Sequence, residues 1–227
     1  LFPAYGLHPM FLDRHRPEHL PLLRDWIARE RPHAVGECGL DFFVPGLDAQ
    51  AQQAYFEGQL RLAREFELPV IVHARRAVDA GIAAQRRFGE LLRVRGKQVL
   101  ENLPEDRPSI VIVSRSYNGC DPGANLQIPG KLRQMGVLAI PLDFLPLDKV
   151  ELPGDWLNMY WRYGQRILAA AEVIAGNPKL HALYLTNFSC GPDSFIMRYF
   201  EERLGSQPVL MIEVDEHSAD AGMITRC

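Results

Sequence analysis

The chain has few cysteines, and they show no paired spacing. Its 227 residues include Cys38, Cys120, Cys190 and Cys227, none of them in a CxxC motif. Cysteines this far apart, in a chain without a secretory signal, favour free thiols or cluster ligands over disulfides.

Long apolar runs and an excess of positive charge are also missing. No stretch reaches the roughly 18 apolar residues of a membrane span, and Leu1-Phe2-Pro3 lacks the basic region that opens a signal peptide. We therefore expect no membrane partner and a cytoplasmic location. The formal net charge of -3 does not indicate the basic surface that tight electrostatic binding of DNA requires. There is no initiator Met, and we expect truncation at both ends.

The first 84 residues alternate between strand and helix patterns. Apolar runs over 3–8, 33–37 and 69–73 predict three strands. Amphipathic spacing predicts a helix over 19–30 and another that Asp48 caps. Repeated βα units of this size predict a slice of a (β/α) barrel over residues 1–84.

Polar residues fall at the ends of these strands. His8, Glu37 and His73 each close a predicted strand, on the face where barrel enzymes build their sites. A carboxylate with neutral imidazoles suits a divalent metal that activates water and polarises a phosphoryl group. His8 taken alone fits a hydrogen-bonded structural role equally well, whereas Glu37 and His73 together favour a metal site.

The motifs YGLHP, GECGLDFF and LPVIVHARRA resemble, in this order and spacing, the TatD family of metal-dependent deoxyribonucleases. The resemblance implies Glu37 and His73 as ligands of Mg²⁺ or Mn²⁺, and catalytic positions near the substrate phosphate for His8 and Arg75. The DxHxH strand of the family, its later histidine and its ETDxP aspartate are missing. A catalytic metal site generally takes three or more protein ligands. We therefore expect DNA to be a substrate only if this site is completed.

Residues 85–227 show a second alternating pattern. It predicts strands over 109–113, 137–140, 183–185 and 209–214, and helices over 86–103, 128–135, 155–175 and 193–204. This order predicts a small doubly wound parallel-sheet (Rossmann-like) domain. The overall prediction is an α/β fold, with partial (β/α) barrel units followed by that domain and a junction in the helix around 79–92.

Polar loops follow these later strands as well. In an open α/β sheet, the loops over 114–118, 187–194 and 215–220 are expected to share one crevice. Cys190, before Gly-Pro at a strand-to-helix turn, suits cluster ligation, and a packed thiol is the equal alternative. Asn118 and Asp193 are further candidates for cofactor binding. Residues 215–217 could form a metal or acid–base group or a solvated capping loop.

The segments DPGANLQIPGKL, NMYWRYGQRIL, YLTNFSCGPDSF and EVDEHSADAGMITR resemble the C-terminal region of acyl-CoA dehydratase activases, which are related to 2-hydroxyacyl-CoA dehydratase components. The resemblance implies a [4Fe–4S] cluster with Cys190 as a ligand, and a dehydratase or second subunit as partner. The chain contains no phosphate-binding loop that would couple ATP hydrolysis to electron transfer.

Three functions follow from these two resemblances. The favoured hypothesis is an iron–sulfur electron-transfer or partner-docking fragment fused to an incomplete nuclease segment. The alternatives are a metal-dependent phosphodiesterase and a catalytically silent chimeric α/β protein.

Overall fold

The computed structural model describes residues 2–152, 154–156, 158–187 and 191–214. The chain divides into two compact units, Leu1–Arg87 and Phe88–Cys227. The boundary lies inside helix α3 (Val78–Glu101), which continues through it without a break. No helix in these described ranges has the length and apolar character needed to cross a membrane.

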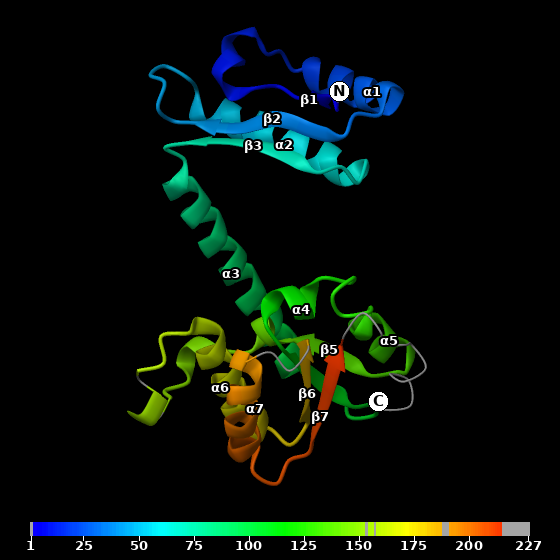
Figure 1. Cartoon of the computed structure of the whole chain (residues 1–227), viewed down its shortest axis with the longest axis vertical. Coiled ribbons are helices and arrows are strands. Elements are labelled where there is room, and N and C mark those ends of the chain that lie inside the picture. The colour runs from blue at the N-terminus through cyan, green and yellow to red at the C-terminus, as the bar shows by residue number, and fades with distance from the viewer. Residues whose placement is uncertain (1, 153, 157, 188–190, 215–227) are drawn as a thin grey trace. The chain divides into compact units, whose positions relative to one another are not determined.

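The first unit is built on a parallel sheet. Its strands, in spatial order, are β1 (Ala4–Tyr5), β2 (Ala34–Asp41) and β3 (Val70–Arg75). Figure 1 shows the three strands side by side, with helices in the connections between them. The connecting elements are the 3₁₀ helix η1 (Pro9–Arg14) and the helices α1 (His19–Glu30) and α2 (Ala49–Glu65). Parallel neighbours need such crossovers because no tight turn can join them.

Two local signals fix the helices of this unit. The Asp48 carboxylate accepts hydrogen bonds from the backbone N–H groups of Gln50 (2.8 Å) and Ala51 (3.1 Å), and so caps α2. In α1, Leu23 and Ile27 lie one turn apart and are buried. They pack with Val35 of β2 and with two residues of α2 in one apolar cluster. The predicted βα order of this segment is therefore present, and β2 continues to Asp41 rather than ending at Glu37.

The second unit has four parallel strands in the order β5-β4-β6-β7. The strands are β4 (Ser109–Val113), β5 (Leu138–Pro141), β6 (Leu180–Asn187) and β7 (Val209–Val214). The helices are α4 (Ser116–Cys120), α5 (Ile128–Gln134), α6 (Arg162–Ala175) and α7 (Gly191–Leu204), with the 3₁₀ turns η2 (Leu142–Phe144), η3 (Leu147–Lys149) and η4 (Gly154–Trp156). In Figure 1, α6 and α7 lie on the opposite side of the sheet from α5.

Both faces of this sheet are covered because its strands are apolar on both sides. Val111 and Val113 of β4 pack with the buried residues of α6 and α7, whereas Ile112 between them packs with Ile128 and Leu132 of α5. Side chains alternate between faces along a strand, so one β-strand serves two cores. The predicted α/β fold with parallel sheets is confirmed.

One predicted helix is shorter than expected. The sequence pattern predicted a helix over 155–175, but α6 begins at Arg162, after an extended Trp161. The segment before it is rich in aromatic residues and contains Asn158, and these residue types have low helix propensity. Packing of Trp156 and Met159 against the core replaces helix formation there.

Candidate metal centre

The strands of the first unit bring His8, Glu37 and His73 together. One potential ligand atom from each of the three residues lies within 4.8 Å of the others. Glu37 Oε1 is 3.1 Å from His73 Nδ1 and 3.6 Å from His8 Nε2. The three residues come from β2, from β3 and from the turn after β1, and the parallel pairing of these strands brings them side by side.

An irregularity in β2 shapes the position of Glu37. The register between β2 and β3 shifts between Gly36 and Cys38, which leaves Glu37 without a partner in the ladder. Such a bulge redirects a side chain, and bulges are common beside active sites. The Glu37 side chain is 48% exposed, whereas Cys38 is fully buried. The carboxylate therefore reaches solvent while its neighbour stays in the core.

Two glycines of β2 allow β3 to lie close to the β2 backbone. A Cβ atom on Gly36 would lie 2.5 Å from the backbone oxygen of Ile71, and one on Gly39 would lie 2.0 Å from that of His73. Both glycines also have positive φ values, 143° and 150°. The two glycines of the GECG motif therefore serve backbone approach, and Glu37 between them supplies the chemistry.

Asp41 is the buried partner of His73. Its Oδ2 atom is 3.0 Å from His73 Nε2, and its Oδ1 accepts the backbone N–H groups of Phe43 (2.9 Å) and Val44 (3.1 Å). Burial acts to raise the pKa of Asp41, but the hydrogen bonds from His73 and from the two backbone groups, with the nearby Arg75 charge, hold that pKa below its ordinary value. Asp41 is therefore an anion, and its carboxylate accepts a hydrogen bond from His73 Nε2–H.

This hydrogen bond determines what His73 presents to Glu37. Neutral histidine carries one N–H. When that N–H is on Nε2 of His73, it donates to the Asp41 carboxylate. The lone pair of Nδ1 then faces Glu37 Oε1 at 3.1 Å. Either a proton on Nδ1, donated to Glu37, or a metal ion beside the two atoms satisfies this contact. Metal–ligand bonds of about 2.0–2.2 Å place neighbouring ligands of one ion about 3.0–3.5 Å apart, so Glu37 and His73 fit as two ligands of a divalent ion.

His8 is held in a different way. Its Nδ1 accepts the backbone N–H of Met10 (3.2 Å), which caps η1. Neutral His8 therefore carries its proton on Nε2, the atom that faces Glu37. In this tautomer, Nε2 is a hydrogen-bond donor and has no lone pair for a metal. His8 is thus placed to donate to Glu37 or to an anionic substrate.

Two glutamines of α2 hold the strand ends that carry the site. Gln52 exchanges hydrogen bonds with both backbone groups of Asp41, at 2.7 and 2.8 Å. Gln59 does the same with Leu7, at 2.6 and 3.1 Å, one residue before His8. Both glutamines are buried. Being seven residues apart, they lie on one helix face and fix two strand ends to one rigid helix.

Arg75 lies at the rim of the site. Its Nη1 is 3.7 Å from Asp41 Oδ2, and its guanidinium stacks over the Phe43 ring at 3.9 Å from the centroid. The Arg75 side chain is 44% exposed, so it keeps donors free of the core. A stacked and exposed guanidinium beside the site suits contact with a phosphate group.

The candidates in the second unit have different surroundings. Asp193 is buried, and its Oδ2 accepts from Arg115 (2.9 Å) and from Thr186 (2.8 Å). This network joins the loop after β4 to the start of α7. Asn118 is buried in α4. Cys190 and residues 215–217 lie outside the described residues, so cofactor binding at Cys190, Asn118 and Asp193 stays a prediction.

The comparisons of sequence with known proteins concern the N-terminal segment. Residues 1–99 match the family described as TatD related DNase. The N-terminal segment is therefore similar to TatD related DNases. The match extends beyond residue 84 and through most of α3. Relatives of this kind are metal-dependent hydrolases, which agrees with the possible metal site on β2 and β3.

Two curated relatives show the extent of the likeness. The uncharacterized metal-dependent hydrolase YjjV of Escherichia coli (strain K12) is 43% identical over 82 residues, which are 35% of this chain and 31% of the relative. The 3'-5' ssDNA/RNA exonuclease TatD of Pantoea sp. (strain At-9b) is 43% identical over 75 residues, 33% and 28% of the two chains. The matched segment thus spans about a third of the length of these relatives.

Among solved structures, the crystal structure of YjjV, the TatD homologue of Escherichia coli K12, aligns with a TM-score of 0.34. The alignment has 22% identity and covers 89% of this chain and 74% of that chain.

Sequence reasoning missed Asp41, Gln52 and Gln59. Asp41 follows Glu37 by four residues, a spacing that shares one face in a regular strand, so GECGLD contained the signal. The two glutamines recur at helical spacing on a face that is otherwise apolar. A polar pair on the buried side of a helix indicates hydrogen bonds to specific backbone groups.

Proposed function

We propose that the N-terminal segment provides the metal site of a metal-dependent hydrolase that acts on phosphodiesters. The observation that supports this most strongly is the arrangement of Glu37 Oε1 and His73 Nδ1, 3.1 Å apart, with Asp41 holding the other ring nitrogen. A ligand histidine backed by a carboxylate is the usual way in which proteins fix the ring and raise its basicity.

Each residue of the proposed site has a separate role. Glu37 and His73 hold the ion, which when bound lowers the pKa of water and polarises a phosphoryl oxygen. Asp41 keeps the proton of His73 on Nε2, so that Nδ1 is always available. His8 Nε2–H and the Arg75 guanidinium offer donors to the non-bridging oxygens of the substrate phosphate. The exposure of Glu37 leaves room for a substrate of this kind.

Single-stranded nucleic acid is the substrate class that we propose, because a relative that covers the same segment is named an ssDNA/RNA exonuclease. The net charge of -3 provides no broad basic surface. Recognition would therefore depend on local contacts at the phosphate, with Arg75 foremost. Arg76 also lies over the Phe43 ring, 4.7 Å from its centroid, so a second guanidinium is close to Arg75 for contact with a neighbouring phosphate.

The test is hydrolysis of bis(p-nitrophenyl) phosphate by the full chain with Mn²⁺. We expect slow metal-dependent turnover, because Glu37 and His73 supply only two protein ligands. Glu37→Gln should lower it by about 100-fold or more, the scale of losing a group that stabilises transition-state charge. The matched control is Glu57→Gln, because Glu57 belongs to the same unit but lies exposed on α2, paired with Arg61. Equal rates for wild type and Glu37→Gln would contradict the proposal.

The iron–sulfur hypothesis remains a separate prediction with its own assay. Within the described residues, Cys38 and Cys120 are the cysteines, and they belong to different units. Burial, with a smaller contribution from the Glu37 charge, raises the pKa of the Cys38 thiol to about 11, which disfavours the thiolate that a cluster needs. Absorbance near 400 nm after anaerobic reconstitution, lost in Cys190→Ser, would favour a cluster.

A further inference from the structure

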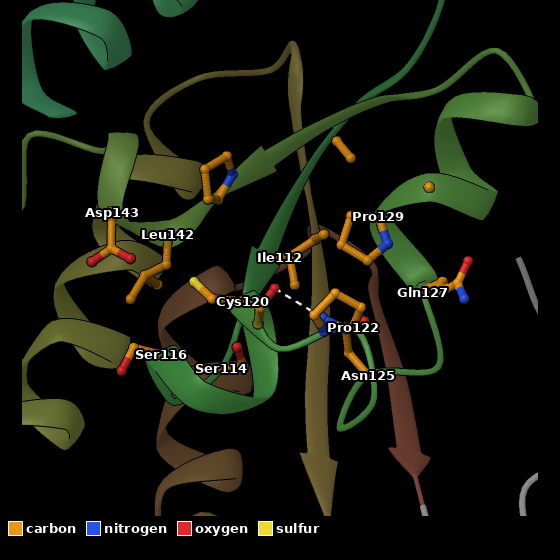
Figure 2. Close-up of a pocket in the computed structure, with 14 residues that line it drawn as sticks. Ile112, Ser114, Ser116, Cys120, Pro122, Asn125, Gln127, Pro129, Leu142 and Asp143 are labelled. Atoms are coloured by element: carbon orange, nitrogen blue, oxygen red, sulfur yellow. Dashed lines mark hydrogen bonds between the residues drawn. The ribbon is translucent and has the colours of Figure 1, made fainter. Parts of the chain in front are cut away.

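The second unit contains a cavity at the carboxyl ends of β4 and β5. Its volume is about 540 Å³, within the range of small-molecule sites. The walls come from β4, β5, α4, α5 and η2, so five elements of the same unit enclose it. Figure 2 shows Asn125 and Gln127 at one end, and Ser116 and Asp143 at the other. No residue of the proposed hydrolase site lines it.

The lining is mostly apolar and carries little charge. Ile112, Leu142 and several prolines supply most of the walls. Asp143 is the acidic residue of the lining, and its carboxylate pairs with Arg166 of α6. Because this charge is already compensated, a charged ligand would gain no counter-ion from Asp143 and would lose its hydration. The cavity is therefore suited to an uncharged molecule.

Asn125 supplies an unused polar group. It is 2% exposed, and its Nδ2 donates to the backbone oxygen of Gly119 at 3.0 Å, which fixes the orientation of the amide. Its Oδ1 atom has no hydrogen-bond partner among the described residues. A buried acceptor without a partner is costly, and one that lines a cavity points to a ligand donor. A small side-chain adjustment, common on ligand binding, would open Oδ1 to that donor.

Cys120 adds a polarizable sulfur atom to the lining of the same cavity. Partial burial, followed by the Asp143 charge, raises the pKa of its thiol, so the sulfur is neutral at physiological pH. A neutral sulfur packs well against the edge or face of a flat ring. The thiol is exposed enough to react with reagents, and it therefore also reports on occupancy of the cavity.

We propose that this cavity binds a small uncharged molecule with a flat apolar body, which packs beside Cys120 and donates one hydrogen bond to Asn125 Oδ1. The site is independent of the metal centre in the first unit. Its ligand class is defined by the apolar walls, the compensated Asp143 and the unpartnered acceptor.

Indole and indene test this proposal, because they have nearly the same shape and only indole carries an N–H donor. The readout is the rate at which 5,5′-dithiobis(2-nitrobenzoate) modifies Cys120 in the full chain, with Cys190→Ser and Cys227→Ser as background. We expect indole to slow modification, with half-protection at a concentration about 5-fold lower than for indene, the scale of one net hydrogen bond. In Asn125→Leu, the two compounds should protect equally.

Variants that fill the cavity provide a second test of the proposal. A Cβ atom on Gly130 meets no atom within 4 Å, so Gly130→Leu should fold and abolish protection by both compounds. Gly89→Leu is the matched control, because Gly89 is equally open on α3 but does not line the cavity. If circular dichroism shows that Gly130→Leu is unfolded, Ala139→Ile fills the space from β5. Three results would each overturn the proposal. They are a lack of protection by indole, equal protection of the wild type by indole and indene, and undiminished protection in the filled variant.

Discussion

The two units use the same parallel βα construction for different purposes. The first unit carries charged and polar groups at its strand ends and leaves Glu37 exposed, with a small apolar cluster around Ile27 and Val35. The second unit buries apolar clusters on both faces of its sheet and pairs Asp193, at the start of α7, with Arg115. Exposed polar side chains are thus concentrated in the unit with the smaller apolar core, and apolar burial in the unit with the larger one.

The largest effect is expected from the core of the second unit. Phe200 is fully buried and meets Tyr184 edge to face, at 5.3 Å between ring centroids. Phe200→Ala should lower the free energy of unfolding of this unit by about 3–5 kcal/mol, because a cavity remains. Urea unfolding followed by Trp156 and Trp161 fluorescence, in a Trp26→Phe background, measures the loss. A loss below about 1 kcal/mol would show that the core does not hold this unit.

A backbone clash is the next largest effect, and it concerns the first unit. Gly39→Ala should destabilise it by about 3 kcal/mol or more, because the added Cβ meets the backbone oxygen of His73 at 2.0 Å and φ is positive. Gly46→Ala is the control: its φ of 85° is also positive, but its Cβ would meet nothing within 4 Å. That change should cost only about 1–2 kcal/mol.

Trp26 fluorescence, with Trp156→Phe and Trp161→Phe as background, follows this unit alone during urea unfolding. Equal losses for the variants at Gly39 and Gly46 would show that strand approach is not what requires glycine beside Glu37.

A smaller effect is expected when Asp41 changes. Asp41→Asn keeps the shape but removes the charge that orients His73. The affinity for Mn²⁺ should fall by about 10–100-fold, the usual range for the loss of such a partner. Titration calorimetry with wild type and variant measures the change. Unaltered affinity would mean that His73 needs no carboxylate to present Nδ1.

The smallest effect is on acid stability. Because the folded state lowers the pKa of Asp41, its carboxylate contributes stability that is fully present above the unfolded value of about 3.9. That contribution is lost as the pH falls through the lower folded value. The first unit of the metal-free protein should therefore weaken below about pH 4, and Asp41→Asn should weaken less over the same range. Trp26-monitored urea midpoints between pH 3 and 6 test this; parallel curves would contradict it.

Much of the fold was predictable because the apolar patterns are strong. The bounds of β4 and β7 agree with the predicted strands, since both are short apolar runs between turn signals. The start of α6 was not predictable, because Trp156 and Met159 gain more from packing on the core than from helix formation.

The site was predictable in part. Glu37 and His73 were predicted to close neighbouring strands. They lie inside β2 and β3, respectively, and the parallel pairing of these strands brings them together. The role of Asp41 depends on how far β2 continues, and the tautomer of His8 depends on the hydrogen bond from Met10 that caps η1. The spacing from Glu37 places Asp41 on the same strand face, but strand pairing sets its contact with His73. The hydrogen bond to His8 is local, and the residue types alone do not specify it.

Binding of Mn²⁺ to the full chain tests the central claim most directly. Titration calorimetry, supported by loss of the free-ion signal in electron paramagnetic resonance, should show one site in the wild type. Affinity should fall by about 10-fold or more in Glu37→Gln and in His73→Gln, the scale of losing a ligand or its partner, and should stay unchanged in Glu57→Gln. Binding of equal strength in the wild type and Glu37→Gln, or no binding in the wild type, would contradict the assignment of Glu37 and His73 as the metal centre.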